Sequence, residues 1–153
     1  MPRRERRSTL VLLDAHIFLD IAERELTQNR HPALVKLLNH HKLILNQRLR
    51  KHYSGVLYKK GEDALRYIDS VEDVASIENV SPSEYSSICL DSRHRPIHSR
   101  DVFICTIARA AKRHSNEVII VSEDPHLSDL DPAYNSDYGI RIVSANSYVE
   151  KFC

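Results

Sequence analysis

The chain has 153 residues, of which 42% are hydrophobic and 28% charged, a balance that suits one globular domain and excludes an intrinsically disordered chain. A formal net charge of +1 excludes a strong overall basic field, and the 3 cysteines are too widely spaced for a disulfide framework or a zinc site. No apolar run could span a bilayer and no secretory signal is visible, so we expect a cytoplasmic protein without a membrane partner.

The first predicted element is a buried strand that ends in an aspartate. We expect residues 1–8 to form a basic, flexible tail and residues 9–153 to form one domain. The apolar run over residues 9–13 predicts a strand, and a helix with apolar residues at helical spacing follows over residues 15–26. Asp14 lies at the junction, and in open α/β sheets ligands bind outside the carboxyl ends of the strands.

The rest of the chain alternates short apolar strands with helices. We predict strands over residues 43–45, 74–80, 118–121 and 140–143. We predict helices from Pro32 onward and over residues 47–58, 62–71, 82–90, 100–113 and 144–152, one helical turn over 127–130, and an irregular loop over 131–139. This alternation indicates a three-layer α/β/α sandwich with a central, mostly parallel sheet of about four or five strands.

Three aspartates are expected to meet at one edge of this sheet. Asp14 ends the first strand, Asp124 follows the strand over residues 118–121, and Asp101 opens the helix that leads into that strand. Taken singly, each aspartate is well explained as a helix cap or a turn residue. Taken together, three carboxylates at one edge would repel each other unless a cation lay between them. Oxygen ligands suit Mg²⁺ or Mn²⁺, and such a site would support phosphodiester hydrolysis.

The order of these motifs resembles the PIN-domain family of nucleases. The motifs are the strand ending in Asp14, the segment LILNQRLRKHYSGVL, the helix start RDVFI and the segment VIIVSED. The resemblance covers nearly the whole chain and implies a compact α/β ribonuclease that depends on Mg²⁺ or Mn²⁺, either a toxin of a toxin–antitoxin pair or an RNA-processing factor. It implies that Asp14, Asp101 and Asp124 are the catalytic, metal-binding acids. Ser122 stands where the family has a supporting Ser or Thr.

One position departs from the family pattern. The family usually has a Glu just before a Tyr on the helix after the second strand, whereas here His52 precedes Tyr53, and no acid occurs between Leu43 and Lys60. His52 could bind a softer metal, hold a phosphate or replace the Glu as a base. Alternatively, it is a partly exposed helix residue beside a site that has lost its full charge. Loss of one carboxylate should weaken Mg²⁺ binding, because hard cations depend on ligand charge.

Two functions are therefore expected. The first is a metal-dependent ribonuclease in which Arg95 and Arg100 guide the RNA backbone. The second is a degenerate PIN domain that binds RNA or protein without cleavage. The resemblance implies RNA as a partner and leaves open a homodimer or an antitoxin-like protein partner. A phosphoryl-accepting receiver domain also has aspartates at strand ends, but it needs a Lys after the last strand, where this chain has Ser144-Ala145-Asn146.

Overall fold

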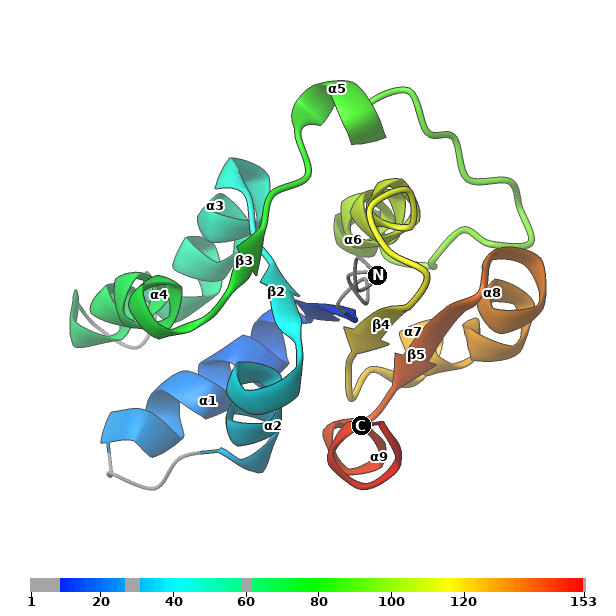
Figure 1. The fold of residues 1–153 in the computed structure, drawn as a ribbon. Coiled ribbons are helices and arrows are strands. Elements are labelled where there is room, and N and C mark those ends of the chain that lie inside the picture. Colours follow the sequence, from blue (N-terminus) through cyan, green and yellow to red (C-terminus); the bar gives the residue numbers. More distant parts are fainter. Residues whose placement is uncertain (1–8, 27–30, 59–61, 153) are drawn as a thin grey trace, which may run out of the picture.

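A single sheet of five parallel strands forms the centre of the molecule, and the computed structural model describes residues 9–26, 31–58 and 62–152. The strand order is β3-β2-β1-β4-β5 (Figure 1). In chain order the strands are β1 (Leu10–Leu13), β2 (Lys42–Ile44), β3 (Ile77–Glu78), β4 (Val118–Val121) and β5 (Ile140–Val143). β1 pairs with both β2 and β4 and lies in the middle of the sheet, whereas the short β3 lies at one edge.

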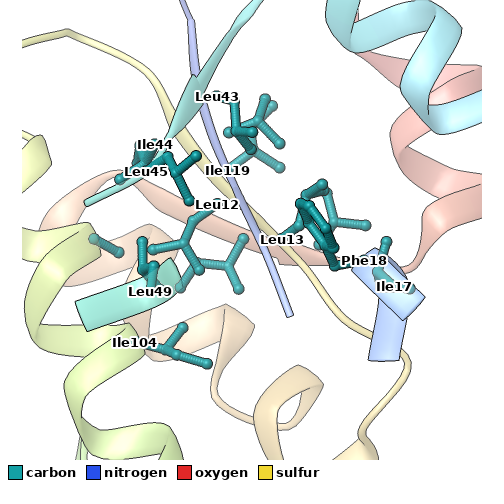
Figure 2. Packing of buried hydrophobic residues seen from close by; sticks show 14 of the residues in the cluster. Leu12, Leu13, Ile17, Phe18, Leu43, Ile44, Leu45, Leu49, Ile104 and Ile119 are labelled. Carbon is teal, nitrogen blue, oxygen red and sulfur yellow. The ribbon is translucent and has the colours of Figure 1, made fainter. Parts of the chain in front are cut away.

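The two central strands are buried along their whole length. Every residue of β1 and of β4 is buried, which explains why both sequences are apolar without alternation. Parallel strands need such continuous apolar runs because helices cover both of their faces. Figure 2 shows how strand residues pack against helix residues in this core, among them Leu12, Ile119, Phe18, Leu49 and Ile104.

Helices cover both faces of the sheet and complete a three-layer α/β/α sandwich, which confirms the predicted fold class. They are α1 (Ala15–Leu26), α2 (Pro32–His40), α3 (Gln47–Leu57), α4 (Glu62–Val74), α5 (Pro82–Tyr85), α6 (Ser99–Ala111), α7 (Pro125–Ser128), α8 (Asp131–Tyr138) and α9 (Ala145–Lys151). In Figure 1, α1, α2 and α9 lie on one side of the sheet and α6 on the other. Within the described ranges, none of these helices is long and apolar enough to cross a membrane.

Side-chain caps fix where the helices α2 and α3 begin. His31 accepts a hydrogen bond from the backbone N–H of Ala33 at 3.0 Å, and Asn46 accepts one from Leu49 at 2.9 Å. Each bond satisfies a donor that the first helical turn leaves without a partner. The amide of Asn46 also donates to the carbonyl of Val80 at 2.7 Å, which ties the start of α3 to the chain beyond β3.

The predicted irregular loop over residues 131–139 was wrong, because residues 131–138 form the helix α8. This segment buries only Tyr134 and therefore has no apolar stripe that would reveal a helix. Its ends nevertheless carry helix signals. Pro132 lies in the first turn, and Gly139 follows the last turn with a left-handed backbone at φ 68°, a conformation that favours glycine.

The helix predicted over residues 82–90 is a single turn, α5. The backbone N–H of Ser81 donates to Glu84 at 2.7 Å at its start, as a capping box requires. Ser86 and Ser87 then follow Tyr85, and serine hydroxyls compete for the backbone groups that would continue a helix. The predicted tail over residues 1–8 lies outside the described residues.

Candidate functional site

The carboxyl ends of β1 and β4 place two of the predicted residues side by side. The strands pair in register up to Leu13 and Val121, so Asp14 and Ser122 follow at neighbouring positions. The backbone N–H of Asp14 donates to the carbonyl of Val121 at 2.9 Å, and that of Ser122 donates to Val143 at 2.9 Å. Because the ladder continues past the strand ends, the backbone holds both side chains at the edge of the sheet.

Ser122 connects Asp14 with Asp124. Its hydroxyl donates to Oδ2 of Asp14 at 2.8 Å and accepts the backbone N–H of Asp124 at 3.0 Å. Ser122 is only 1% exposed, and water therefore competes little for these bonds. The other oxygen of Asp14, Oδ1, accepts the N–H of Ala15 at 2.7 Å. The Asp14 carboxylate is thus fixed by one side chain and one backbone group.

The third aspartate reaches the same place from the first turn of α6. Asp101 is 4% exposed, and Asp14 is 6% exposed. Both line one cavity of about 60 Å³. The full lining of this cavity, called the acidic cavity below, is Asp14, Ala15, His16, His52, Val56, Asp101 and Asp124. The fold therefore brings together the three aspartates that the sequence singled out, together with His52.

The acidic cavity offers side-chain atoms that suit a hard cation, but these side chains are not arranged as a complete metal-binding group. Carboxylate oxygens are preferred ligands of Mg²⁺ and Mn²⁺, and the two imidazoles add softer donors. Within the part of the chain that the structure describes, however, no group of three or more His, Cys, Asp or Glu side chains is arranged to hold a metal ion. One carboxylate has another role, since Oδ1 of Asp124 caps α7 by accepting the N–H of His126 at 2.9 Å.

The neighbour of His52 is a core residue. Tyr53 is fully buried, its ring stacks on Phe18 at a centroid distance of 4.5 Å, and its hydroxyl donates to the carbonyl of Leu13. Burial raises the pKa of the Tyr53 phenol far above its usual value. Tyr53 thus anchors α3 to the end of β1, directly before Asp14, and the adjacent His52 lines the acidic cavity.

A second cavity adjoins the acidic one, and sequence reasoning missed most of it. It has a volume of about 440 Å³ and is lined by Arg48, Lys51, His52, Ser99 and Phe103. We call it the basic cavity. His52 lines both cavities. The signal was present as spacing, because positions 48, 51 and 52 share one face of α3, and positions 99 and 103 share one face of α6.

The structure describes the side chain of only one of the two arginines that were expected to guide RNA. Arg95 is exposed in the connection before α6 and lines neither cavity. The side chain of Arg100 lies outside the described residues. His94, in the same connection, is buried between Asp91 and Asp137, with its ring nitrogens 2.6 Å from a carboxylate oxygen of each.

No protein-family model matches this chain, and no curated protein matches it either. The residues of the two adjoining cavities are therefore the basis for any functional conclusion.

Proposed function

We propose that this chain is a metal-dependent ribonuclease of the PIN type, which hydrolyses RNA phosphodiester bonds with Mg²⁺ or Mn²⁺. One observation carries the proposal: Asp14, Asp101 and Asp124 come from three separate elements and line the same small cavity at the carboxyl edge of the sheet. Helix capping accounts for a single aspartate at a helix start, but it gives no reason for three of them to share a cavity. A shared cation gives that reason, because it offsets their mutual repulsion.

Each residue of the acidic cavity has a distinct role in this proposal. Asp14, Asp101 and Asp124 would hold the cation. A bound Mg²⁺ or Mn²⁺ supplies water activation and neutralises charge on the phosphate. Ser122 orients Asp14 through its 2.8 Å hydrogen bond. His52, in place of the usual Glu, can move a proton at a ring nitrogen or donate to a phosphate oxygen.

Cleavage of a fluorescent single-stranded oligoribonucleotide tests the proposal. We expect the full chain to cleave it in Mn²⁺ or Mg²⁺ and not in EDTA. Asp14→Asn should lower the rate by about 100-fold or more, because it removes a charged ligand. Asp73→Asn is the matched control, since Asp73 is exposed on α4, away from both cavities. Absence of cleavage by the unmodified chain in both metals, or full activity of Asp14→Asn, would refute the ribonuclease assignment.

A degenerate PIN domain that binds without cutting is the second candidate. It is favoured by His52 in place of an acid and by the lack of a closed metal-binding group among the described residues. Under this reading, Asp14→Asn and the unmodified chain bind the oligoribonucleotide equally well, and neither cleaves it. For either function we propose a cytoplasmic setting, which is supported by the free thiols of Cys89 and Cys105.

A further inference from the structure

We propose that the basic cavity binds the backbone phosphate and base of a nucleotide next to the scissile bond, and that it accepts single-stranded RNA. This proposal rests on the proposed function, because it extends the substrate from the acidic cavity into its neighbour. The two cavities share His52. A strand that crosses His52 would therefore have one phosphate at the three aspartates and the next at the basic side chains.

The size of the basic cavity suits a nucleotide. Sites for ligands of nucleotide size usually measure about 300–1,000 Å³, and this cavity measures about 440 Å³. The acidic cavity, at about 60 Å³, is far too small for a base or a ribose. The base and the ribose must therefore lie outside the acidic cavity, with only a phosphate reaching the aspartates. The adjoining basic cavity is large enough to hold them.

The charges of α3 are arranged for an anionic ligand. Arg50 is neutralised by Asp69, at 2.9 Å, and by Glu72. Arg48 and Lys51, on the cavity side of the same helix, have no carboxylate partner among the residues that the structure describes. Two adjacent cations repel each other, and a phosphate between them would relieve that repulsion. The cations of this helix that lack a described carboxylate partner are thus the ones that line the cavity.

An aromatic ring completes the cavity and points to unpaired bases. The guanidinium of Arg48 lies over the ring of Phe103 at 5.0 Å, and the ring of His52 meets Phe103 edge-on at 4.9 Å. Binding sites for single strands combine a basic groove with aromatic and guanidinium planes on which bases stack. In a duplex the base faces are already stacked, so this combination favours a single strand.

Fluorescence anisotropy with a labelled oligouridylate in EDTA tests the proposal on the full chain. We expect Arg48→Glu/Lys51→Glu to weaken binding about tenfold or more and to reduce the slope of log Kd against log salt by about 1.4, which is about 0.7 for each lost phosphate contact. Phe103→Leu should weaken binding about fivefold through lost stacking. The charge-matched control Arg113→Glu/Lys151→Glu reverses two exposed cations that line neither cavity and should bind almost normally.

Equal affinity of the two double variants would overturn the proposal, and so would a failure of the unmodified chain to bind the oligouridylate. Displacement of the RNA by inorganic phosphate at equal phosphate concentration would also overturn it, because it would mark a site for free anions. Arg48→Gln/Lys51→Gln, with a thermal melt of each variant, separates loss of binding from loss of folding.

Failure of the ribonuclease function gives a different result. RNA binding that depends on Arg48 and Lys51, without cleavage in any metal, would support the basic cavity as an RNA-binding site and refute the ribonuclease function. Cleavage with unchanged kcat and KM in Arg48→Glu/Lys51→Glu would support the ribonuclease function and refute the basic cavity as its substrate site.

Discussion

At the scale of single residues, Ser122 determines how the acidic cavity is organised. Its hydroxyl is the donor to Asp14 and the acceptor for the backbone of Asp124, so one buried group joins two candidate ligands that come from different loops. A hydroxyl suits both bonds because it donates and accepts at the same time. A cysteine thiol would be larger and would bond more weakly, and alanine would lose both interactions.

We therefore predict that Ser122→Ala destabilises the fold by about 1.5–3 kcal/mol, because the buried carboxylate of Asp14 loses a hydrogen-bond donor. Urea unfolding measures this change. Ser122→Thr keeps the hydroxyl and should retain most of the stability. Both variants should also be titrated with Mn²⁺, since a misplaced Asp14 should bind the ion more weakly. Equal stability of Ser122→Ala and the unmodified chain would show that the hydrogen bond to Asp14 contributes nothing.

At the scale of elements, a histidine joins three segments beside the edge strand β3. His114, just after α6, lies between Glu78 of β3 and Glu84 of α5, and its Nδ1 is 2.7 Å from Glu78. Hydrogen bonds to Glu78 and then to Glu84 raise the pKa of His114 above its ordinary value of 6.5. The backbone N–H of Ser81, followed by His114, lowers the pKa of Glu84 below its ordinary value of 4.5.

These shifts predict a pH window for the stability of this contact. A raised histidine pKa contributes stability that is complete below pH 6.5 and is lost as the pH rises through the folded-state pKa. A lowered glutamate pKa contributes stability that is complete above pH 4.5 and is lost as the pH falls through the folded-state pKa. The contribution of the His114–Glu84 pair is therefore complete between these two values.

His114→Gln isolates this effect because glutamine can bond to a carboxylate but does not titrate near neutrality. Compared with the unmodified chain, the variant should be less stable by about 1–2 kcal/mol near pH 6, and the difference should shrink as the pH rises. Urea unfolding at a series of pH values gives the difference directly. A difference that stays constant from acid to alkaline pH would show that His114 is not charged in the folded state.

Elements with a strong apolar pattern were predictable from the sequence, and elements held by polar contacts were not. The strands β1, β4 and β5 and the helix α1 have their predicted bounds to within one residue, because burial dictates their composition. α8 was missed because it buries only Tyr134, and α5 was predicted too long because Ser86 and Ser87 stop it.

The acidic cavity could be predicted because parallel strands share a carboxyl edge. The basic cavity could not be predicted in full, since residue spacing shows which side chains share a face of α3 or α6 but not that the two faces line one cavity.

At the scale of the whole molecule, the strand order explains where the site lies. From the central β1, the chain runs outward through β2 and β3 and then returns to β4 on the other side of β1. At such a reversal of direction the connections leave a crevice at the carboxyl ends of the two strands. Asp14 and Ser122 follow those two strands, so the topology creates the space that their side chains line.

The three aspartates at this crevice predict that stability depends on divalent metal. An ion that binds only the folded chain stabilises it by about 2.7 kcal/mol at 100 times its Kd, which is a rise in Tm of about 5–11 °C for a domain of this size. We expect Mn²⁺ to raise the Tm of the unmodified chain by about this amount and EDTA to reverse the rise.

Asp101→Asn should abolish the metal-dependent rise in Tm. Its Tm in EDTA should be unchanged or higher, because the substitution removes one of three carboxylates that repel each other. Asp73→Asn changes the same charge on the exposed face of α4 and should respond to Mn²⁺ as the unmodified chain does. A Tm that is the same in Mn²⁺ and EDTA would mean that the aspartates bind no ion, and an equal rise in Asp101→Asn would place the ion elsewhere.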